Sequence, residues 1–221
     1  RSDTMADDDT RQGASHRTAE LMSYVQGVHA THSADHQSAF DAPDRFEIPA
    51  IHLGASEAKL LTLLMRLIKA KKIVEVGTLA GYSAMRLADG LETGGKLWTI
   101  EYEPQHAEVA EQIIGKAGYA DRIEVLTGAG AYVLPTLEDH GPFDAVFVDA
   151  DKESYGFYGR WAARNIRPGG LLIGDNAYVF GELLDDSERG DAMRQFHEEA
   201  AEHFDTTCIP TPEGMLIGIR K

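Results

Sequence analysis

Residues 143–152, which read FDAVFVDADK, decide the fold of this chain. They form an apolar run of strand length that stops at Asp149. Residues 171–176, LLIGDN, repeat the pattern and stop at Asp175 and Asn176. In an open parallel sheet the carboxyl ends of neighbouring strands meet at one edge, where ligands bind. We therefore expect these three side chains to converge, although 26 positions separate the two aspartates.

The converging side chains form a candidate metal site. Two carboxylates and an amide oxygen suit a hard divalent cation that keeps several waters, Mg²⁺ above all, with Mn²⁺ or Ca²⁺ as alternatives. Lys152 adds a titratable amine three residues after Asp149. Each residue alone has a simpler interpretation. Asp149 could cap the next helix, and Lys152 could be a solvated surface lysine. Asp175 and Asn176 could form an ordinary turn. Together, at converging strand ends, they indicate chemistry.

Strands and helices alternate on both sides of these two runs. We expect a first amphipathic helix near 18–29, a loop or broken helix over 30–50, and a second helix that begins near its N-cap, Ser56. Strands are then expected at 72–76, 96–101, 123–126, 143–149, 171–175, 206–209 and 215–220. Helices are expected at 81–91, 104–115, 131–137, 154–166 and 187–204. Repeated βα units predict an α/β fold with a doubly wound, mostly parallel, Rossmann-like seven-stranded sheet, and the last two strands form an antiparallel C-terminal hairpin.

A glycine loop follows the first strand of the predicted sheet. Residues 74–83 read VEVGTLAGYS, in which Gly77 and Gly81 permit a tight turn and a close approach of ligand to backbone. The spacing G-x-x-x-G differs from G-x-G-x-x-G, so the pyrophosphate fingerprint is absent. Glu101 ends the next strand, where a carboxylate would hydrogen-bond ribose hydroxyls. Glycine between a strand and a helix is also ordinary turn chemistry, but with Glu101 the pattern predicts a nucleoside ligand without a pyrophosphate.

Charge and hydropathy argue against two kinds of partner. The net charge of −15 disfavours a nucleic-acid ligand, because phosphate binding requires a basic face. No apolar run approaches the roughly 20 residues that span a membrane, so we expect no membrane partner.

The spacing of the histidines suits no zinc motif, and we expect these side chains to be mostly exposed: His29, His32, His36 and His52.

The chain is of a size for one domain. With 221 residues it can bury a sizeable core, and we expect a single domain over 18–221 with an N-terminal helical extension. We interpret 1–17 as a tag remnant before Met5 followed by a disordered N-terminus. The single cysteine, Cys208, forms no internal disulfide and fits a reducing, cytoplasmic location.

Several motifs together resemble a known enzyme family. They are VEVGTxxGYS, an acidic strand end, VDADKESY and RPGGxxxxDN. This order resembles the cation-dependent class I S-adenosylmethionine (SAM) O-methyltransferases, the group of caffeoyl-CoA and catechol O-methyltransferases with its small bacterial members. The resemblance runs from about Ile51 to the C-terminus, and DADKxxY with a downstream DN is its specific part. It implies a class I methyltransferase fold, SAM and a divalent cation as cofactors, and a homodimer.

The resemblance also implies roles for individual residues. Asp149, Asp175 and Asn176 match the metal ligands, and Lys152 matches the catalytic lysine. We further expect substrate contacts from Lys152 and Asn176, and from aromatic residues near the strand ends: Tyr155, which could border the site, and Tyr178 and Phe180, which are placed to clamp an aromatic substrate. Cofactor contacts are implied at Leu53, Glu75, Gly77, Thr78, Ser83, Glu101, Gly128, Ala129 and Asp149.

The expected activity is Mg²⁺-dependent transfer of the SAM methyl group to a hydroxyl of a small aromatic vicinal diol. A phenol is a poor nucleophile at neutral pH because its pKa is ~10. A cation that chelates two adjacent hydroxyls would stabilise the phenolate and orient one oxygen towards the methyl group. One alternative is an NAD-dependent oxidoreductase, which the missing G-x-G-x-x-G disfavours. Another is a non-catalytic SAM-binding interaction protein, which the intact set of candidate site residues disfavours. The acidic charge disfavours methylation of RNA or protein.

Overall fold

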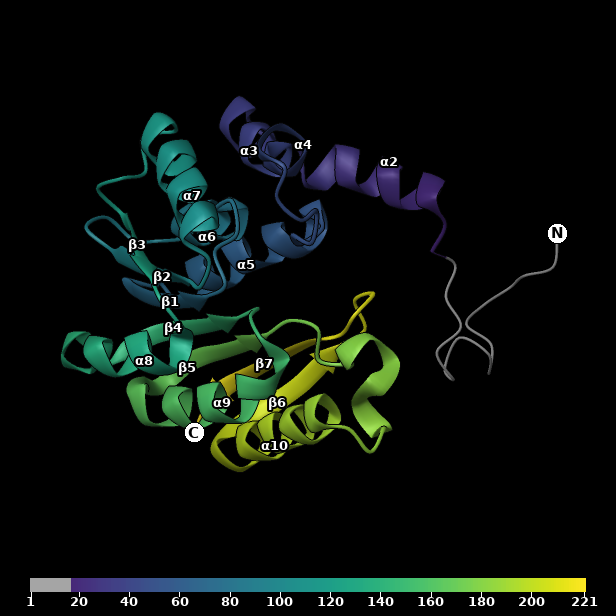
Figure 1. The fold of residues 1–221 in the computed structure, drawn as a ribbon, viewed down its shortest axis with the longest axis vertical. Helices are drawn as coiled ribbons and strands as arrows, with labels where there is room; N and C mark the ends of the chain where they lie inside the picture. Colours follow the sequence, from purple (N-terminus) through teal and green to yellow (C-terminus); the bar gives the residue numbers. More distant parts are fainter. Residues whose placement is uncertain (1–16) are drawn as a thin grey trace, which may run out of the picture. The chain divides into compact units, whose positions relative to one another are not determined.

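A computed structural model describes residues 17–221, in two units. The first unit ends at Thr31 and holds helix α2 (Ala19–His29), whose N-cap Thr18 accepts a hydrogen bond from the backbone of Leu21. The second unit, His32–Lys221, holds the sheet drawn in Figure 1. Apart from its last residue, the segment expected to be a tag remnant and disordered N-terminus lies outside the described residues. The domain boundary at residue 18 stays a prediction.

The second unit is built on a seven-stranded sheet with the order β3-β2-β1-β4-β5-β7-β6. Strands β1 to β5 pair in parallel, and β7 pairs antiparallel with both β5 and β6. This confirms the predicted doubly wound, mostly parallel sheet with an antiparallel C-terminal hairpin. The strands are β1 (Lys72–Val76), β2 (Lys96–Glu101), β3 (Ile123–Thr127), β4 (Phe143–Val148), β5 (Ile166–Gly174), β6 (Phe204–Ile209) and β7 (Met215–Arg220).

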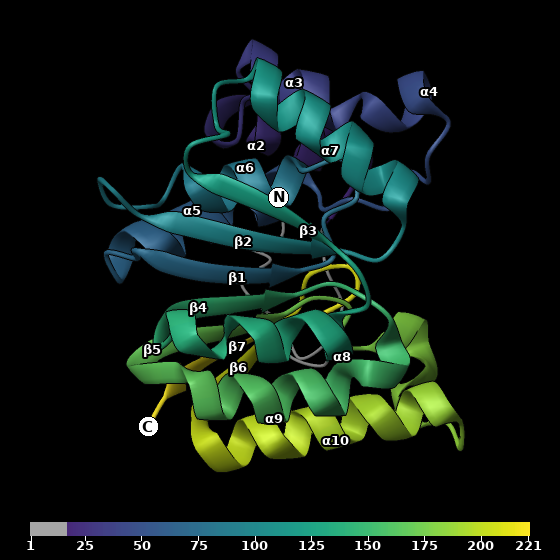
Figure 2. The ribbon, with the colours of Figure 1, turned by 60° about the vertical axis from the view of Figure 1, so that its left-hand side comes forward.

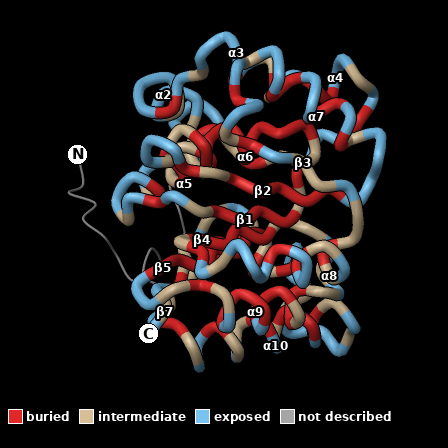
Figure 3. Tube along the Cα trace, turned by 90° about the vertical axis from the view of Figure 1, so that its left-hand side faces the viewer, coloured by how far each residue is buried: buried red, intermediate tan, exposed pale blue. Residues whose placement is uncertain are grey.

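Helices cover both faces of the sheet (Figure 2). Successive strand side chains point to opposite faces, so Ile73 of β1 enters one core and Val74 the other. The first core is closed by α3 (Ala34–Phe40), α4 (Ala42–Phe46), α5 (Ala55–Leu67), α6 (Tyr82–Ala88) and α7 (Pro104–Lys116). On the other side lie α8 (Gly130–Val133), the 3-10 helix η1 (Leu134–His140), α9 (Tyr155–Asn165) and α10 (Glu188–His203). Figure 3 shows the central strands buried between these layers.

The structure corrects several predicted element boundaries: the helix expected at 81–91 ends at Ala88, and that expected at 131–137 is the short α8 followed by η1. Two further corrections concern α5 and β5. Helix α5 is capped by Gly54 rather than Ser56, and the Glu57 carboxylate accepts a hydrogen bond from the Gly54 N–H at 2.9 Å. The RPGG run at 167–170 was expected to follow the end of a helix, yet it lies inside β5. Strand β5 starts early because Ile166 already pairs with Phe143 of β4. A shift in register between Phe143 and Ala145 accommodates the RPGG run. Among residues 17–221, no helix is long and apolar enough to cross a membrane.

Candidate active site

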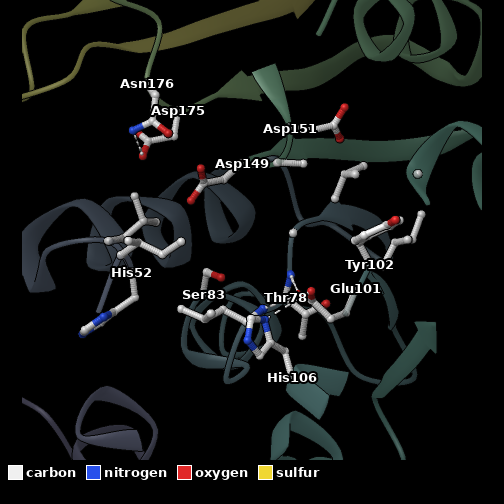
Figure 4. Close-up of a pocket in the computed structure, with 18 of the residues that line it drawn as sticks. His52, Thr78, Ser83, Glu101, Tyr102, His106, Asp149, Asp151, Asp175 and Asn176 are labelled. Carbon is white, nitrogen blue, oxygen red and sulfur yellow. Dashed lines mark hydrogen bonds and ion pairs between the residues drawn. The ribbon is translucent and has the colours of Figure 1, made fainter. Parts of the chain in front are cut away.

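The carboxyl ends of the parallel strands are held in register by backbone hydrogen bonds that continue one residue past the strands. The N–H of Asp149 donates to the carbonyl of Val76, and the N–H of Asp175 donates to the carbonyl of Val148, each at 2.9 Å. The residues after β4 and β5 therefore lie at one edge of the sheet. Asp149, Asp175 and Asn176 come to the same cavity, as Figure 4 shows.

This cavity has a volume of about 890 Å³ and gathers most of the candidate residues. It is lined by the candidate metal ligands, by Lys152, and by every expected cofactor position except Glu75. The lining cofactor positions are Leu53, Gly77, Thr78, Ser83, Glu101, Gly128, Ala129 and Asp149. The neighbours Tyr102 and His106 line the cavity beside Glu101 (Figure 4). One cavity thus joins the glycine loop to the carboxylate pair.

Glycine at position 77 is required by the close approach of two strand ends. Gly77 has a φ of +101°, and a Cβ on it would lie 1.9 Å from the carbonyl oxygen of Asp149. A larger residue would force the loop after β1 away from the end of β4. The glycine loop and the candidate metal ligand Asp149 are therefore built as one unit.

The Glu101 carboxylate is fixed at the cavity by three backbone donors. Its Oε2 accepts hydrogen bonds from the N–H groups of Thr78 at 3.1 Å and Leu79 at 2.7 Å. Its Oε1 accepts from the N–H of Glu103 at 3.0 Å and lies 3.6 Å from Nδ1 of His106. A carboxylate has about four lone-pair positions, so this one can still accept hydroxyl donors from the cavity side. Its rigid placement at the end of β2 suits recognition of a ribose diol.

Glu75 is buried within β1 and does not line the cavity. It is fully buried, and its Oε2 accepts a hydrogen bond from the Thr99 hydroxyl at 2.6 Å. The same hydroxyl lies 2.6 Å from that of Thr78, which lines the cavity. Burial raises the pKa of Glu75 to about 8, although hydrogen bonds from Ser83 and Thr99 oppose the shift. Glu75 therefore supports the cavity wall from inside the core.

The two aspartates form an electrostatically strained pair. Burial raises the pKa of both, and the negative charge of Asp149 adds to the shift that brings the pKa of Asp175 to about 7. The Lys152 ammonium offsets part of the shift at Asp149, because its Nζ lies 3.3 Å from Oδ1. Asn176 donates its side-chain amide to Oδ2 of Asp175 at 3.1 Å.

These residues fit a hard divalent cation. Both carboxylates have pKa values raised by burial, and the charge of Asp149 raises that of Asp175 further, so the pair gains from a cation placed between them. Asn176 can turn its amide oxygen inward. Within the described part of the chain, no group of three or more His, Cys, Asp or Glu side chains could hold a metal. The candidate set differs in kind, because its third ligand is an asparagine.

Neither tyrosine expected to contact substrate lines the cavity. Tyr155 is fully buried at the start of α9, and its hydroxyl donates to the carbonyl of Asp175 at 2.9 Å. Nζ of Lys152 donates a hydrogen bond to that hydroxyl at 3.2 Å, so Tyr155 holds the lysine side chain in place. Tyr178 packs on Gly214, where a Cβ would come within 2.7 Å of the tyrosine ring. Phe180, two residues further along the same loop, lines the cavity instead.

The histidines are less exposed than the sequence led us to expect. Among the four singled out, only His29 is exposed. His36 is buried, with its Nε2 3.1 Å from a carboxylate oxygen of Asp89. His32 is 2.8 Å from the Tyr82 hydroxyl, and His52 lines the cavity with both ring nitrogens buried and without a partner in the described chain. The sequence over 30–52 has no periodic apolar pattern from which the burial of His32, His36 and His52 could have been predicted.

Comparison with known proteins places the chain in a family. A family model described as O-methyltransferase matches residues 39–221. A catechol O-methyltransferase from Mycobacterium tuberculosis is 42% identical over 178 residues, which cover 79% of this chain and 80% of that protein. A second, from Niastella koreensis, is 38% identical over 176 residues, with coverage of 79% and 80%.

Solved structures agree with this result. The O-methyltransferase TomG from Streptomyces achromogenes, in complex with SAM, has a TM-score of 0.87 at 33% identity and covers 91% of this chain and 96% of its own. An O-methyltransferase from Bacillus cereus in complex with SAH also has a TM-score of 0.87, at 32% identity, and covers 91% and 97%. The sheet is that of a class I methyltransferase. The chain belongs to the O-methyltransferase family, which confirms the resemblance seen in its motifs and makes it an enzyme.

Proposed function

We propose that this enzyme transfers the methyl group of SAM to one hydroxyl of a small catechol-type acceptor, with Mg²⁺ or a similar divalent cation bound at Asp149, Asp175 and Asn176. The observation that carries the proposal is the single cavity that joins the fixed carboxylate of Glu101 to the strained aspartate pair. The first feature suits a nucleoside, and the second suits a cation. The printed names of the relatives, catechol O-methyltransferase and a SAM complex, support the same combination.

The cofactor end of the cavity would bind SAM. Glu101 accepts the ribose hydroxyls, and Gly77 and Thr78 form the turn against which the cofactor lies. Gly128 and Ala129, at the end of β3, border the base. Leu53 and Ser83 line the wall on the side of α5 and α6. SAM supplies a methyl group on a positively charged sulfur, which makes that carbon an electrophile. The aspartate pair lines the same cavity, so a methyl group supplied from this end would be within the cavity that holds the acceptor.

The other end would hold and ionise the acceptor. When bound, a divalent cation supplies Lewis-acid stabilisation for an ionised catechol hydroxyl. Asp149, Asp175 and Asn176 would hold it through oxygen atoms. Lys152, with 11% of its side chain exposed, is braced by the Tyr155 hydroxyl and faces the same site. In its neutral form the Lys152 amine takes the hydroxyl proton. The acceptor oxygen then bonds to the methyl carbon as the carbon–sulfur bond breaks and its electron pair stays on sulfur.

Methyl transfer from SAM to matched acceptors tests this proposal. The panel contains catechol, its positional isomer resorcinol and phenol. We expect methylation of catechol alone, because only adjacent hydroxyls can chelate one cation. Equal turnover of phenol and catechol would remove the reason for a vicinal diol. Failure to methylate any of them while SAM binds would reject this acceptor class.

Assembly and compartment are also proposals. The family resemblance supports a homodimer, which light scattering on the purified chain would test by its mass. A cytoplasmic location is consistent with Cys208, whose half-buried thiol is free.

A further inference from the structure

One charged side chain at the acceptor end has no place in the proposed chemistry. Glu213 lines the cavity from the tip of the β6–β7 hairpin. Its carboxylate makes no hydrogen bond or ion pair with any residue in the described range 17–221. Three other carboxylates that line the cavity here have partners: Glu57 accepts the N–H of Gly54 at 2.9 Å, Asp149 pairs with Lys152 at 3.3 Å, and Asp175 accepts the Asn176 amide at 3.1 Å.

The backbone holds Glu213 beside the metal-ligand loop. The N–H of Tyr178 donates to the carbonyl of Glu213, and the N–H of Ala177 donates to the carbonyl of Gly214, both at 2.9 Å. These bonds tie the hairpin tip to the two residues that follow Asn176. Packing of the Tyr178 ring on Gly214 fixes the same contact. The Glu213 side chain is thus attached to the edge of the cavity near the aspartates.

Apolar residues line the same cavity as Glu213. Pro212 precedes Glu213 in the hairpin tip, and Phe180 reaches the cavity from the loop after Asn176, with 56% of its surface exposed. An aromatic acceptor whose diol points towards Asp175 can direct the substituent on the far side of its ring towards this rim. The charge on that substituent then meets Glu213 in a partly desolvated setting, where Coulomb interactions are stronger than in water.

We propose that Glu213 selects the acceptor by the charge of its ring substituent, favouring catechols that carry an amine and disfavouring those that carry a carboxylate. The inference rests on the proposed catechol activity and specifies its acceptor class further. It also implies that this enzyme disfavours coenzyme A thioesters as acceptors, because they carry several negative charges.

Three acceptors with the same diol and one variable group test the inference: 3,4-dihydroxybenzylamine, 3,4-dihydroxybenzyl alcohol and 3,4-dihydroxyphenylacetate. The measured quantity is kcat/KM for each, together with its Kd by calorimetry in the presence of Mg²⁺ and SAH, which needs no turnover. For the unaltered enzyme we expect the amine to be preferred over the carboxylate in both measurements, with the alcohol between them.

Substitution of Glu213 should change this order. Glu213→Gln should lower the amine-to-carboxylate ratio by about fivefold, the effect of roughly 1 kcal/mol from one partly exposed charge. Glu213→Lys should lower it further. Glu111→Gln is the matched control, because it removes the same charge from an exposed position on α7 outside the cavity. It should leave the ratio unchanged.

Two results would overturn the inference. The first is an equal preference for the three acceptors in the unaltered enzyme. The second is a ratio that responds to Glu213→Gln no more than to Glu111→Gln. Failure of the proposed function is distinguishable from both, because the neutral alcohol would then not be methylated at all.

Discussion

Replacing Glu101 by glutamine is a sharp test of the cofactor site, because it keeps the shape of the side chain and removes one acceptor atom. Oε2 serves the N–H groups of Thr78 and Leu79, and Oε1 serves that of Glu103. A glutamine has one oxygen and can place it at only one of these positions. We expect it at the position of Oε2, where two backbone N–H groups donate. The amide nitrogen then faces the Glu103 N–H and the ribose. Loss of a charged hydrogen bond of this kind costs about 1–3 kcal/mol, which weakens SAM binding by about 5- to 150-fold.

Calorimetric titration with SAM and with SAH measures this loss, and thermal unfolding of the free protein measures the cost to the fold. We expect the unfolding free energy to fall by only about 0.5–1.5 kcal/mol, because a single exposed backbone donor loses its partner. Glu111→Gln again serves as the charge-matched control and should bind both ligands normally. An affinity of Glu101→Gln equal to that of the control would refute the assignment of β2 as the ribose-binding strand.

Three further changes test the rest of the site. Lys152→Ala should lower kcat by about 10²–10⁴-fold while SAM affinity is retained, and a catechol with a more acidic hydroxyl should partly restore the rate; a normal kcat at neutral pH would leave the lysine only a positioning role. Asp175→Ala should abolish most methyl transfer but leave SAM binding measurable by calorimetry, whereas near-full activity would remove Asp175 from the metal site. Burial raises the pKa of Glu75 from 4.5 to about 8, so the folded state binds this proton more tightly than the unfolded state does. The protonated carboxyl contributes its full stabilisation below about pH 4.5, and this contribution is lost as the pH rises to about 8. Glu75→Gln should therefore flatten the decline in melting temperature over that range, and an unchanged slope would contradict the raised pKa.

The sheet was predictable because its signals are local. Apolar runs of strand length, each followed by a turn and a helix, identify parallel strands before any contact is known. The start of β5 was missed because RPGG reads as a turn, whereas pairing across the sheet with β4 decides its conformation. Pairing of this kind depends on a segment more than twenty residues away, and no local pattern encodes it.

The candidate site was predictable to the extent that strand ends define it. Asp149 and Asp175 follow directly from that rule, whereas the direction of a side chain does not. Glu75 was expected at a cofactor-binding position, and that role stays a prediction. It does not line the cavity, because the alternation along β1 places it on the same face as the buried Ile73, a signal that was available. Tyr155 and Tyr178 lie near the strand ends, yet neither lines the cavity. Tyr155 is buried against Phe196 of α10, and the half-buried Tyr178 packs on Gly214 in the β6–β7 hairpin, so both placements depend on the C-terminal part of the chain.

The central claim is that methyl transfer depends on a cation held by Asp149, Asp175 and Asn176. Its most direct test is the rate of catechol methylation by SAM in excess EDTA, followed by addition of Mg²⁺ beyond the chelator. We predict that turnover stops in EDTA and returns with Mg²⁺, while calorimetry shows that SAM binding continues throughout. Full turnover in EDTA, by enzyme freed of bound metal, would contradict the account.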